Sequence, residues 1–176
     1  AYLFDDQVQT ASAMLAAYEH TGEARWLERA DVLVRRMVAD YWDAADGGFF
    51  DTRAAAEGLL TTRVKPIQDA PTSSANATAA LVLLRLGAIT GEAHRERAEH
   101  LLTAFAGTAA EMGIHGSTYL RAVDFLIQAE CKIVVADSPA APLGLLSEAL
   151  RTYRPRRVVV QQTPGAADAL TPPAAM

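Results

Sequence analysis

Two segments of the chain, 69 positions apart, end a predicted helix in the same way. Thr21-Gly22-Glu23 follows one helical pattern, and Thr90-Gly91-Glu92 follows another. In both, glycine stands where a helix C-terminus needs the left-handed backbone conformation that other residues avoid. The segment before each glycine is apolar on nearly all sides, whereas the segment after it is amphipathic. The repeat therefore predicts two αα-hairpins, each pairing a buried helix with a half-exposed one.

The apolar helices are predicted over residues 7–20, 75–89 and 118–128, and the amphipathic helices over residues 25–41 and 93–110. We expect the apolar helices to be buried nearly all round, because a helix with one exposed side does not need apolar residues there. Asp5 and Asp6 are candidate caps of the first apolar helix, and Ser74 is the candidate cap of the second. No amphipathic partner follows the third.

This alternation at a long period is typical of αα-hairpins in two concentric layers, as in an α/α-toroid or a solenoid. The predicted fold is mainly α, a partial α/α-toroid, and two and a half hairpins cannot close a toroid alone. An exposed inner face of several hundred Å² would cost on the order of 10 kcal/mol. We therefore expect missing N-terminal hairpins, or self-association, to cover the inner helices. The chain opens at Ala1 without an initiator Met, so we also expect it to be a piece of a longer protein.

A β-hairpin excursion is predicted between the two helical hairpins. The helical pattern stops near Tyr41, Gly47-Gly48 supplies a turn, and Phe49-Phe50-Asp51-Thr52 favours extended backbone. Residues 60–65 are expected to pair back onto this segment. The excursion would thus place Asp51, Arg63 and Lys65 close together.

The periodicity changes after the third apolar helix. Residues 132–136 and 157–160 are β-branched runs, and residues 143–153 between them are helical in pattern. Together they predict a small βαβ unit with parallel strands. The predicted organisation is therefore helical hairpins over residues 1–129, a βαβ appendage over 130–163, and a poorly ordered tail over 164–176 that is rich in proline and alanine.

Charge and composition narrow the classes of partner. The formal net charge of −5 argues against nucleic acid or an anionic membrane as the main partner. The apolar run over residues 77–89 is broken by Arg85 and is too short to span a bilayer. A single cysteine, Cys131, fits a small apolar residue in a reducing compartment. With no signal peptide pattern at the N-terminus, the expected location is cytoplasmic.

Candidate functional residues lie at the starts of the apolar helices and on the excursion. In a layered toroid these helix starts converge on one rim, where free N–H groups and helix dipoles favour anionic or hydroxyl ligands. Paired carboxylates there could act as acid and base on a sugar, and aromatic faces could stack on its ring. The candidate catalytic residues are Asp6, Asp51 and Asp69, and the candidate ligand-binding residues are Gln7, Phe50, Arg63, Lys65, Thr72, Ser74, Asn76 and Tyr119.

Structural roles compete with each of these assignments. Asp6 and Ser74 could simply cap helices, and Asp51 could end a strand. Phe50 could pack in a loop, and Arg63 and Lys65 could be surface charges of a hairpin. Asn76 is different, because capping does not need it inside the first turn of an apolar helix. The four histidines lie at helix ends or on exposed faces without metal-ligand spacing, so neither a metal nor a cofactor is predicted.

Several segments carry a family resemblance: Phe4-Asp5-Asp6-Gln7, the run Tyr18 to Ala30, the stretch Trp42 to Thr52, and Asp69 to Asn76. Over residues 1–163 the chain resembles the C-terminal half of thioredoxin-domain-containing proteins of the YyaL and spermatogenesis-associated type. The resemblance implies an α/α-toroid like that of six-hairpin glycosidases and N-acylglucosamine 2-epimerases, joined to an N-terminal thioredoxin-like domain. Redox chemistry is not expected in this chain, because the thioredoxin-like part with its Cys-x-x-Cys pair lies outside it.

The match to the family's second rim motif, approximately Asp-Gly-Ala-Thr-Pro-Ser-Gly-Asn, is partial. Asp69, Thr72, Ser74 and Asn76 match in register, whereas the two glycines are replaced by Ala70 and Ala75. Asp6 matches the acid that opens the earlier helix. Epimerase chemistry would need histidines on the inner helices, and none stands there.

Two functional hypotheses follow. In the first, the chain is part of a carbohydrate-active or carbohydrate-binding toroid, in which Asp6 and either Asp51 or Asp69 act on or bind a sugar. In the second, the toroid is a non-catalytic scaffold or regulatory module that binds a protein partner and serves a separate thioredoxin-like domain.

Overall fold

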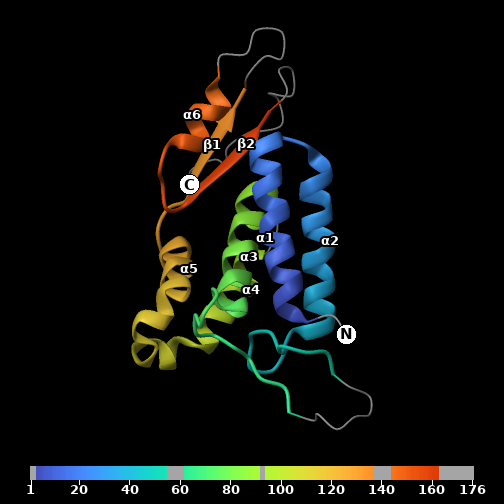
Figure 1. The fold of residues 1–176 in the computed structure, drawn as a ribbon, viewed down its shortest axis with the longest axis vertical. Helices are drawn as coiled ribbons and strands as arrows, with labels where there is room; N and C mark the ends of the chain where they lie inside the picture. Colours follow the sequence, from blue (N-terminus) through green and yellow to red (C-terminus); the bar gives the residue numbers. More distant parts are fainter. Residues whose placement is uncertain (1–2, 55–61, 92–93, 137–143, 163–176) are drawn as a thin grey trace, which may run out of the picture.

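A computed structural model describes residues 3–54, 62–91, 94–136 and 144–162. This part of the chain is mainly helical, with a small parallel sheet of two strands (Figure 1). The elements are α1 (Phe4–Thr21), α2 (Ala24–Tyr41), α3 (Ala75–Thr90), α4 (His94–Ala104), the 3₁₀ segments η1 (Ala106–Glu111) and η2 (Gly113–Gly116), α5 (Ser117–Ile127), β1 (Cys131–Val135), α6 (Leu145–Arg151) and β2 (Arg157–Gln161).

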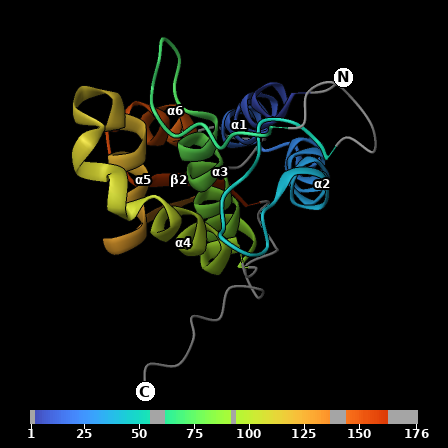
Figure 2. The same ribbon diagram turned by 90° about the horizontal axis from the view of Figure 1, so that it is seen from below.

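The helices form two layers. Seen from below, α5, α3 and α1 follow one another in one row, with α4 and α2 on one side of it (Figure 2). Helix α1 packs on α2, α3 packs on α4, and α3 also contacts α1 and α5. The N-terminal ends of α1, α3 and α5 all lie at the lower end of the molecule in Figure 1, and the sheet lies at the upper end. The predicted pairing of the first two apolar helices with the amphipathic helices that follow them is confirmed, as α1 with α2 and α3 with α4.

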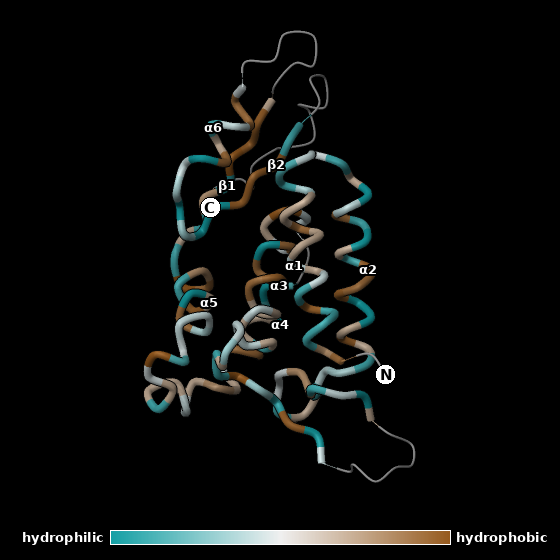
Figure 3. The backbone as a smooth tube through the Cα atoms, in the orientation of Figure 1, coloured by the Kyte–Doolittle hydropathy of each residue, from teal (hydrophilic) through white to brown (hydrophobic). Residues whose placement is uncertain are grey.

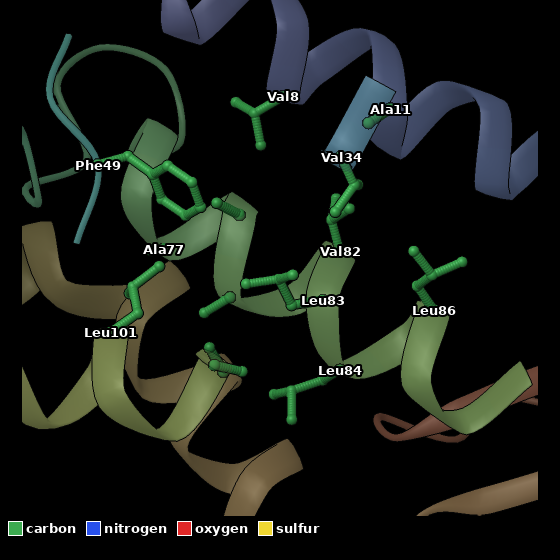
Figure 4. Packing of buried hydrophobic residues seen from close by; sticks show 14 of the residues in the cluster. Val8, Ala11, Val34, Phe49, Ala77, Val82, Leu83, Leu84, Leu86 and Leu101 are labelled. Atoms are coloured by element: carbon green, nitrogen blue, oxygen red, sulfur yellow. The ribbon is translucent and has the colours of Figure 1, made fainter. Parts of the chain in front are cut away.

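Helix α3 is the centre of the core. Ser74 caps it by accepting a hydrogen bond from the Ala77 N–H, and Gly91 ends it with φ of 72°. Its apolar residues face both layers (Figure 4). Val82 and Leu86 lie on the side of α1 and α2, and Leu83 lies on the side of Leu101 of α4. A helix of this composition can be stable only when neighbours cover nearly all of its sides, and this prediction is confirmed for α3.

Helix α1 is not buried all round, contrary to expectation. Val8, Ala11 and Leu15 are fully buried, whereas Gln9 and Ala13 on other sides are exposed. Asp5 and Asp6 also do not cap it. The cap position is Leu3, which makes no side-chain hydrogen bond, and the two acids lie inside the first turn. There their charge complements the positive end of the helix dipole.

Helix α2 has the predicted amphipathic character. Ala30, Val34, Met37 and Tyr41 are buried on one side, and hydrophilic residues alternate with them along the helix (Figure 3). Helix α4, by contrast, ends at Ala104 and not near residue 110, and the chain continues as 3₁₀ turns. Phe105 leaves the helical path and packs its ring against the Gly48 turn, so a tertiary contact overrides the local pattern there.

The segment after α2 turns back without forming the predicted β-hairpin. Trp42 and Phe49 make an isolated antiparallel bridge, and the Phe50 N–H donates to the Tyr41 carbonyl. Of the expected returning segment, residues 60 and 61 lie outside the described residues. The Val64 carbonyl accepts a backbone hydrogen bond from the Asp51 N–H, but no strand forms over residues 62–65.

The C-terminal βαβ unit is confirmed. Strand β1 pairs in parallel with β2, and Cys131 is in register with Arg157. The two strands are joined through α6, which contacts both. Strand β2 also packs on α1 and α3, and its Val158 is fully buried in the same core as the helices. The tail predicted over residues 164–176 lies outside the described residues.

Candidate functional site

The Asp69 carboxylate joins the starts of α3 and α5. Its Oδ1 accepts from the Ser74 N–H at 2.8 Å, while its Oδ2 accepts from the Ser117 hydroxyl at 2.7 Å and from the Thr118 N–H at 2.9 Å. The backbone of Asp69 also pairs with His115, just before α5. Free N–H groups at helix starts are natural partners of a carboxylate. Asp69 thus holds the rim loop over residues 66–74 against the start of α5.

These bonds determine the protonation of Asp69. Burial alone would raise its pKa, but the hydrogen bonds from Ser74, Thr118 and Ser117 outweigh that effect and hold the pKa below the usual value. The carboxylate is therefore ionised at neutral pH. A general acid needs the opposite shift, so this environment suits an anchoring role.

Asn76 is fully buried and bonds to two backbone segments. Its Oδ1 accepts from the Phe49 N–H at 2.7 Å, and its Nδ2 donates to the carbonyls of Phe49 and Pro66, both at 2.9 Å. An amide has two N–H donors, and both are used inside the protein. Asn76 therefore links the excursion and the rim loop to the first turn of α3.

Asp51 and Val64 bind each other at the edge of the excursion. The Asp51 N–H donates to the Val64 carbonyl at 2.8 Å, and the Asp51 Oδ1 accepts from the Val64 N–H at 3.1 Å. The Asp51 carbonyl also accepts from the N–H of Phe4, the first residue of α1. The structure thus places Asp51 beside the start of α1.

The cations of the excursion are engaged with its own residues. The Arg63 guanidinium lies 3.7 Å from the centre of the Phe50 ring, a cation–π contact. Lys65 binds the Asp43 carboxylate at 2.6 Å and the Gly47 carbonyl at 2.8 Å. The hydrogen bond from Lys65, followed by those from backbone N–H groups, lowers the pKa of Asp43. These contacts brace the Gly47-Gly48 turn.

The remaining predicted residues are not gathered at one point. Gln7 is buried and donates through its Nε2 to the Tyr41 hydroxyl at 2.7 Å. Tyr119 is buried and donates to the Leu102 carbonyl at 2.8 Å, and its burial raises its pKa. Thr72 is exposed on the rim loop, and Asp6 is exposed on α1.

A polar cleft of about 320 Å³ is lined by side chains of α1, α3 and α5 and by none of α2 or α4. It reaches from the rim at one end to the segment before β2 at the other. Each helix contributes side chains at intervals of three, four or seven residues, which place them on one helix face. The lining comprises Gln9, Ser12 and Glu19 of α1, Thr78, Leu81 and Arg85 of α3, Thr118, Arg121 and Phe125 of α5, and Ser73, Arg154, Pro155 and Arg157.

The sequence reasoning missed this cleft, although a signal was present. Thr78 and Arg85 interrupt an otherwise apolar helix, and both lie on the cleft side. Arg85 binds the buried Glu19 of α1 at 2.8 Å. The Thr78 hydroxyl is buried and has no hydrogen-bond partner among the described residues. Polar residues on the buried side of an apolar helix indicate a polar surface beyond it.

The fold and cleft together define a layered αα-hairpin protein with a polar cleft along α1, α3 and α5. In the part of the chain that the structure describes, no three His, Cys, Asp or Glu side chains gather in a way that could hold a metal ion. None of the helices described there has the length and apolar character needed to cross a membrane.

Comparisons with known proteins identify homologues. The chain is 30% identical over 159 residues to spermatogenesis-associated protein 20 of Rattus norvegicus, and it matches the proteins of that name from Mus musculus and Homo sapiens to the same extent. The match covers 89% of this chain and 20% of each relative, so the chain spans about a fifth of the length of the relatives. No family model matches it.

Proposed function

We propose that this chain forms part of a carbohydrate-binding α/α-toroid, and that the cleft along α1, α3 and α5 holds the sugar. The observation that carries the proposal is the lining of the cleft, where hydroxyl, amide and guanidinium groups from three helices face one space of about 320 Å³. That volume suits a small molecule, and these groups are the hydrogen-bonding partners that sugar hydroxyls need.

The proposal is for binding and not for hydrolysis, because two of the three candidate catalytic acids have structural partners. Both carboxylate oxygens of Asp69 accept hydrogen bonds, and Asp51 accepts from Val64 and Thr52. Asp6 has no side-chain hydrogen bond or ion pair within the described residues. It lies one turn before Gln9 on α1, so helical spacing puts it on the cleft side, near the rim. We assign Asp6 to binding sugar hydroxyls there.

Isothermal titration of the chain against a panel of neutral and charged monosaccharides and disaccharides tests this function. At least one sugar should bind, and Asp6→Asn should weaken it roughly tenfold, the effect of losing a hydrogen bond to a charged group. Asp46→Asn is the matched control, because Asp46 is an exposed acid on the turn after α2. Silence across the panel, or equal effects of the two substitutions, would remove the proposal.

The scaffold hypothesis has one observation in its favour. Leu120 and Ile127 of α5 are 57% and 68% exposed, and a separation of seven residues places them on the same side of the helix. An exposed apolar stripe of this kind is typical of a protein contact. A partner held through these two residues, with no sugar binding by the cleft, would favour the scaffold role.

A further inference from the structure

Positive charge is concentrated in the cleft of a chain that is negative as a whole. Four arginines line the cleft, namely Arg85, Arg121, Arg154 and Arg157, against one glutamate, Glu19. The formal net charge of the chain is −5, so this cluster does not follow from overall composition. A cleft lined by one sign of charge attracts ligands of the opposite sign.

Two of the four arginines are committed to the fold. Arg85 bonds to Glu19 through two nitrogens, at 2.8 and 3.3 Å. The Arg157 guanidinium donates to the carbonyls of Ala149, Leu150 and Thr152, where α6 ends. A helix C-terminus carries partial negative charge and free carbonyls, which explains the position of Arg157.

Among the contacts that the structure describes, the side chains of the other two arginines, Arg121 and Arg154, are not used in bonds that hold the fold together. Arg121 and Arg154 are exposed and make no hydrogen bond, ion pair or cation–π contact through their side chains within the described residues. They come from different elements, Arg121 from α5 and Arg154 from the turn before β2. The fold therefore brings two free guanidinium groups to one cleft. A guanidinium presents a planar fork of N–H donors that matches the oxygens of a carboxylate or a phosphate.

We propose that the cleft takes an anionic sugar, one that bears a phosphate or a carboxylate group, and that Arg121 and Arg154 bind that group. The sugar part rests on the function proposed above, whereas the anion part rests on the arginines alone. Glu19 is neutralised by Arg85, so it does not oppose an anion. The amide of Gln9 and the hydroxyl of Ser12 on α1 remain for the neutral part of the ligand.

Titration calorimetry with four probes separates these parts: glucose, glucose 6-phosphate, glucuronate and inorganic phosphate. We expect one of the two charged sugars to bind at least tenfold more tightly than glucose, and added salt to weaken it. Preference for glucose 6-phosphate would identify phosphate as the group bound, and preference for glucuronate would identify carboxylate. Arg121→Gln and Arg154→Gln should each weaken the preferred charged sugar roughly tenfold or more and leave glucose unchanged.

Arg29→Gln is the matched control, because Arg29 lies on α2 beside Trp26 and loses the same charge outside the cleft. Circular dichroism of each variant checks that the fold is kept. Equal affinity for glucose and both charged sugars, or equal losses in Arg29→Gln and Arg121→Gln, would overturn the anion proposal and leave the sugar function standing. Binding of phosphate that Arg121→Gln abolishes, with no sugar bound more tightly than phosphate, would support the anion site and remove the sugar function.

Discussion

Asn76 binds both backbone polar groups of Phe49, accepting from its N–H at 2.7 Å and donating to its carbonyl at 2.9 Å. The two residues are 27 positions apart, and Phe49 is itself fully buried between Phe4 and Trp42. This pairing attaches the turn after α2 to the central helix α3. It replaces the β-hairpin that the sequence predicts.

Replacing Asn76 should therefore be among the most damaging single changes at the rim. Asn76→Ala leaves the N–H and the carbonyl of the buried Phe49 without their side-chain partner, which should lower the free energy of unfolding by about 2–4 kcal/mol. Urea unfolding measures this loss. Thr72→Ala, at an exposed position of the same rim loop, should change it by less than about 0.5 kcal/mol. A small effect of Asn76→Ala would contradict the proposed link.

The ionisation of Asp69 should make the free energy of unfolding depend on pH in the acidic range. Its folded pKa lies below the usual value, so its contribution is fully present above the unfolded pKa of about 3.9 and is lost as the pH falls through the lower folded value. Asp69→Asn should cost about 1–2 kcal/mol at pH 7, allowing for partial exposure. The difference between the two proteins should shrink below about pH 4.

Urea unfolding at several pH values measures the Asp69 effect. Asp46→Asn, on an exposed acid, should give little difference at any of them. A difference between Asp69→Asn and the unchanged protein that stays constant with pH would show that the carboxylate charge is not what joins α3 to α5.

Gly48 has φ of 80°, and a Cβ built there would lie 3.1 Å from the Phe105 ring. Gly48→Ala should lower the free energy of unfolding by about 1–3 kcal/mol, since it adds both backbone strain and a close contact. Gly107→Ala is the control, because Gly107 lies outside the positive-φ region and a Cβ there meets nothing within 4 Å. Thermal unfolding compares the two, and equal effects would argue against a tight turn at Gly48.

Thr78→Val should leave stability unchanged or raise it by up to about 1 kcal/mol. The Thr78 hydroxyl is buried without a partner in the described part of the chain, and removing such a group relieves a desolvation cost. Ser74→Ala on the same helix should instead lose about 1 kcal/mol, because Ser74 is the cap of α3. Chemical unfolding tests both, and a clear loss in Thr78→Val would show that the hydroxyl has a partner in the fold.

If the partial-toroid hypothesis holds, the chain by itself should self-associate. Leu120 and Ile127 offer an exposed apolar surface on α5, and covering it should favour association. Sedimentation velocity at increasing concentration should show species larger than a monomer, and the double change Leu120→Gln with Ile127→Gln should shift them toward the monomer. Val32→Gln, at a 66% exposed position on α2, should not. A compact monomer at all concentrations, with cooperative melting, would contradict the partial-toroid hypothesis.

Local patterns in the sequence were sufficient for most of the secondary structure. The helix ends at Gly22 and Gly91, the cap at Ser74 and the parallel strands of the βαβ unit were predicted and are confirmed. Each depends on a few neighbouring residues, because capping, left-handed glycine and hydrophobic periodicity act over one or two turns. The prediction that the amphipathic helix after Gly91 extends to residue 110 was wrong. Phe105 contacts the Gly48 turn, which is distant in the sequence, so a local pattern could not predict that contact.

Only the tertiary structure decided what the polar residues do. The sequence predicted Asn76 and Tyr119 as ligand-binding residues. In the structure, the Asn76 amide donates to the carbonyls of Phe49 and Pro66, and the Tyr119 hydroxyl donates to the carbonyl of Leu102. The sequence analysis did not mark Arg121 or Arg154 as ligand-binding candidates, because nothing in the segment around either arginine indicates a cleft. Hydrogen-bond partners and the walls of the cleft come from segments that are distant in the sequence and come into contact only when the helices pack. Residue spacing along the chain therefore does not predict them.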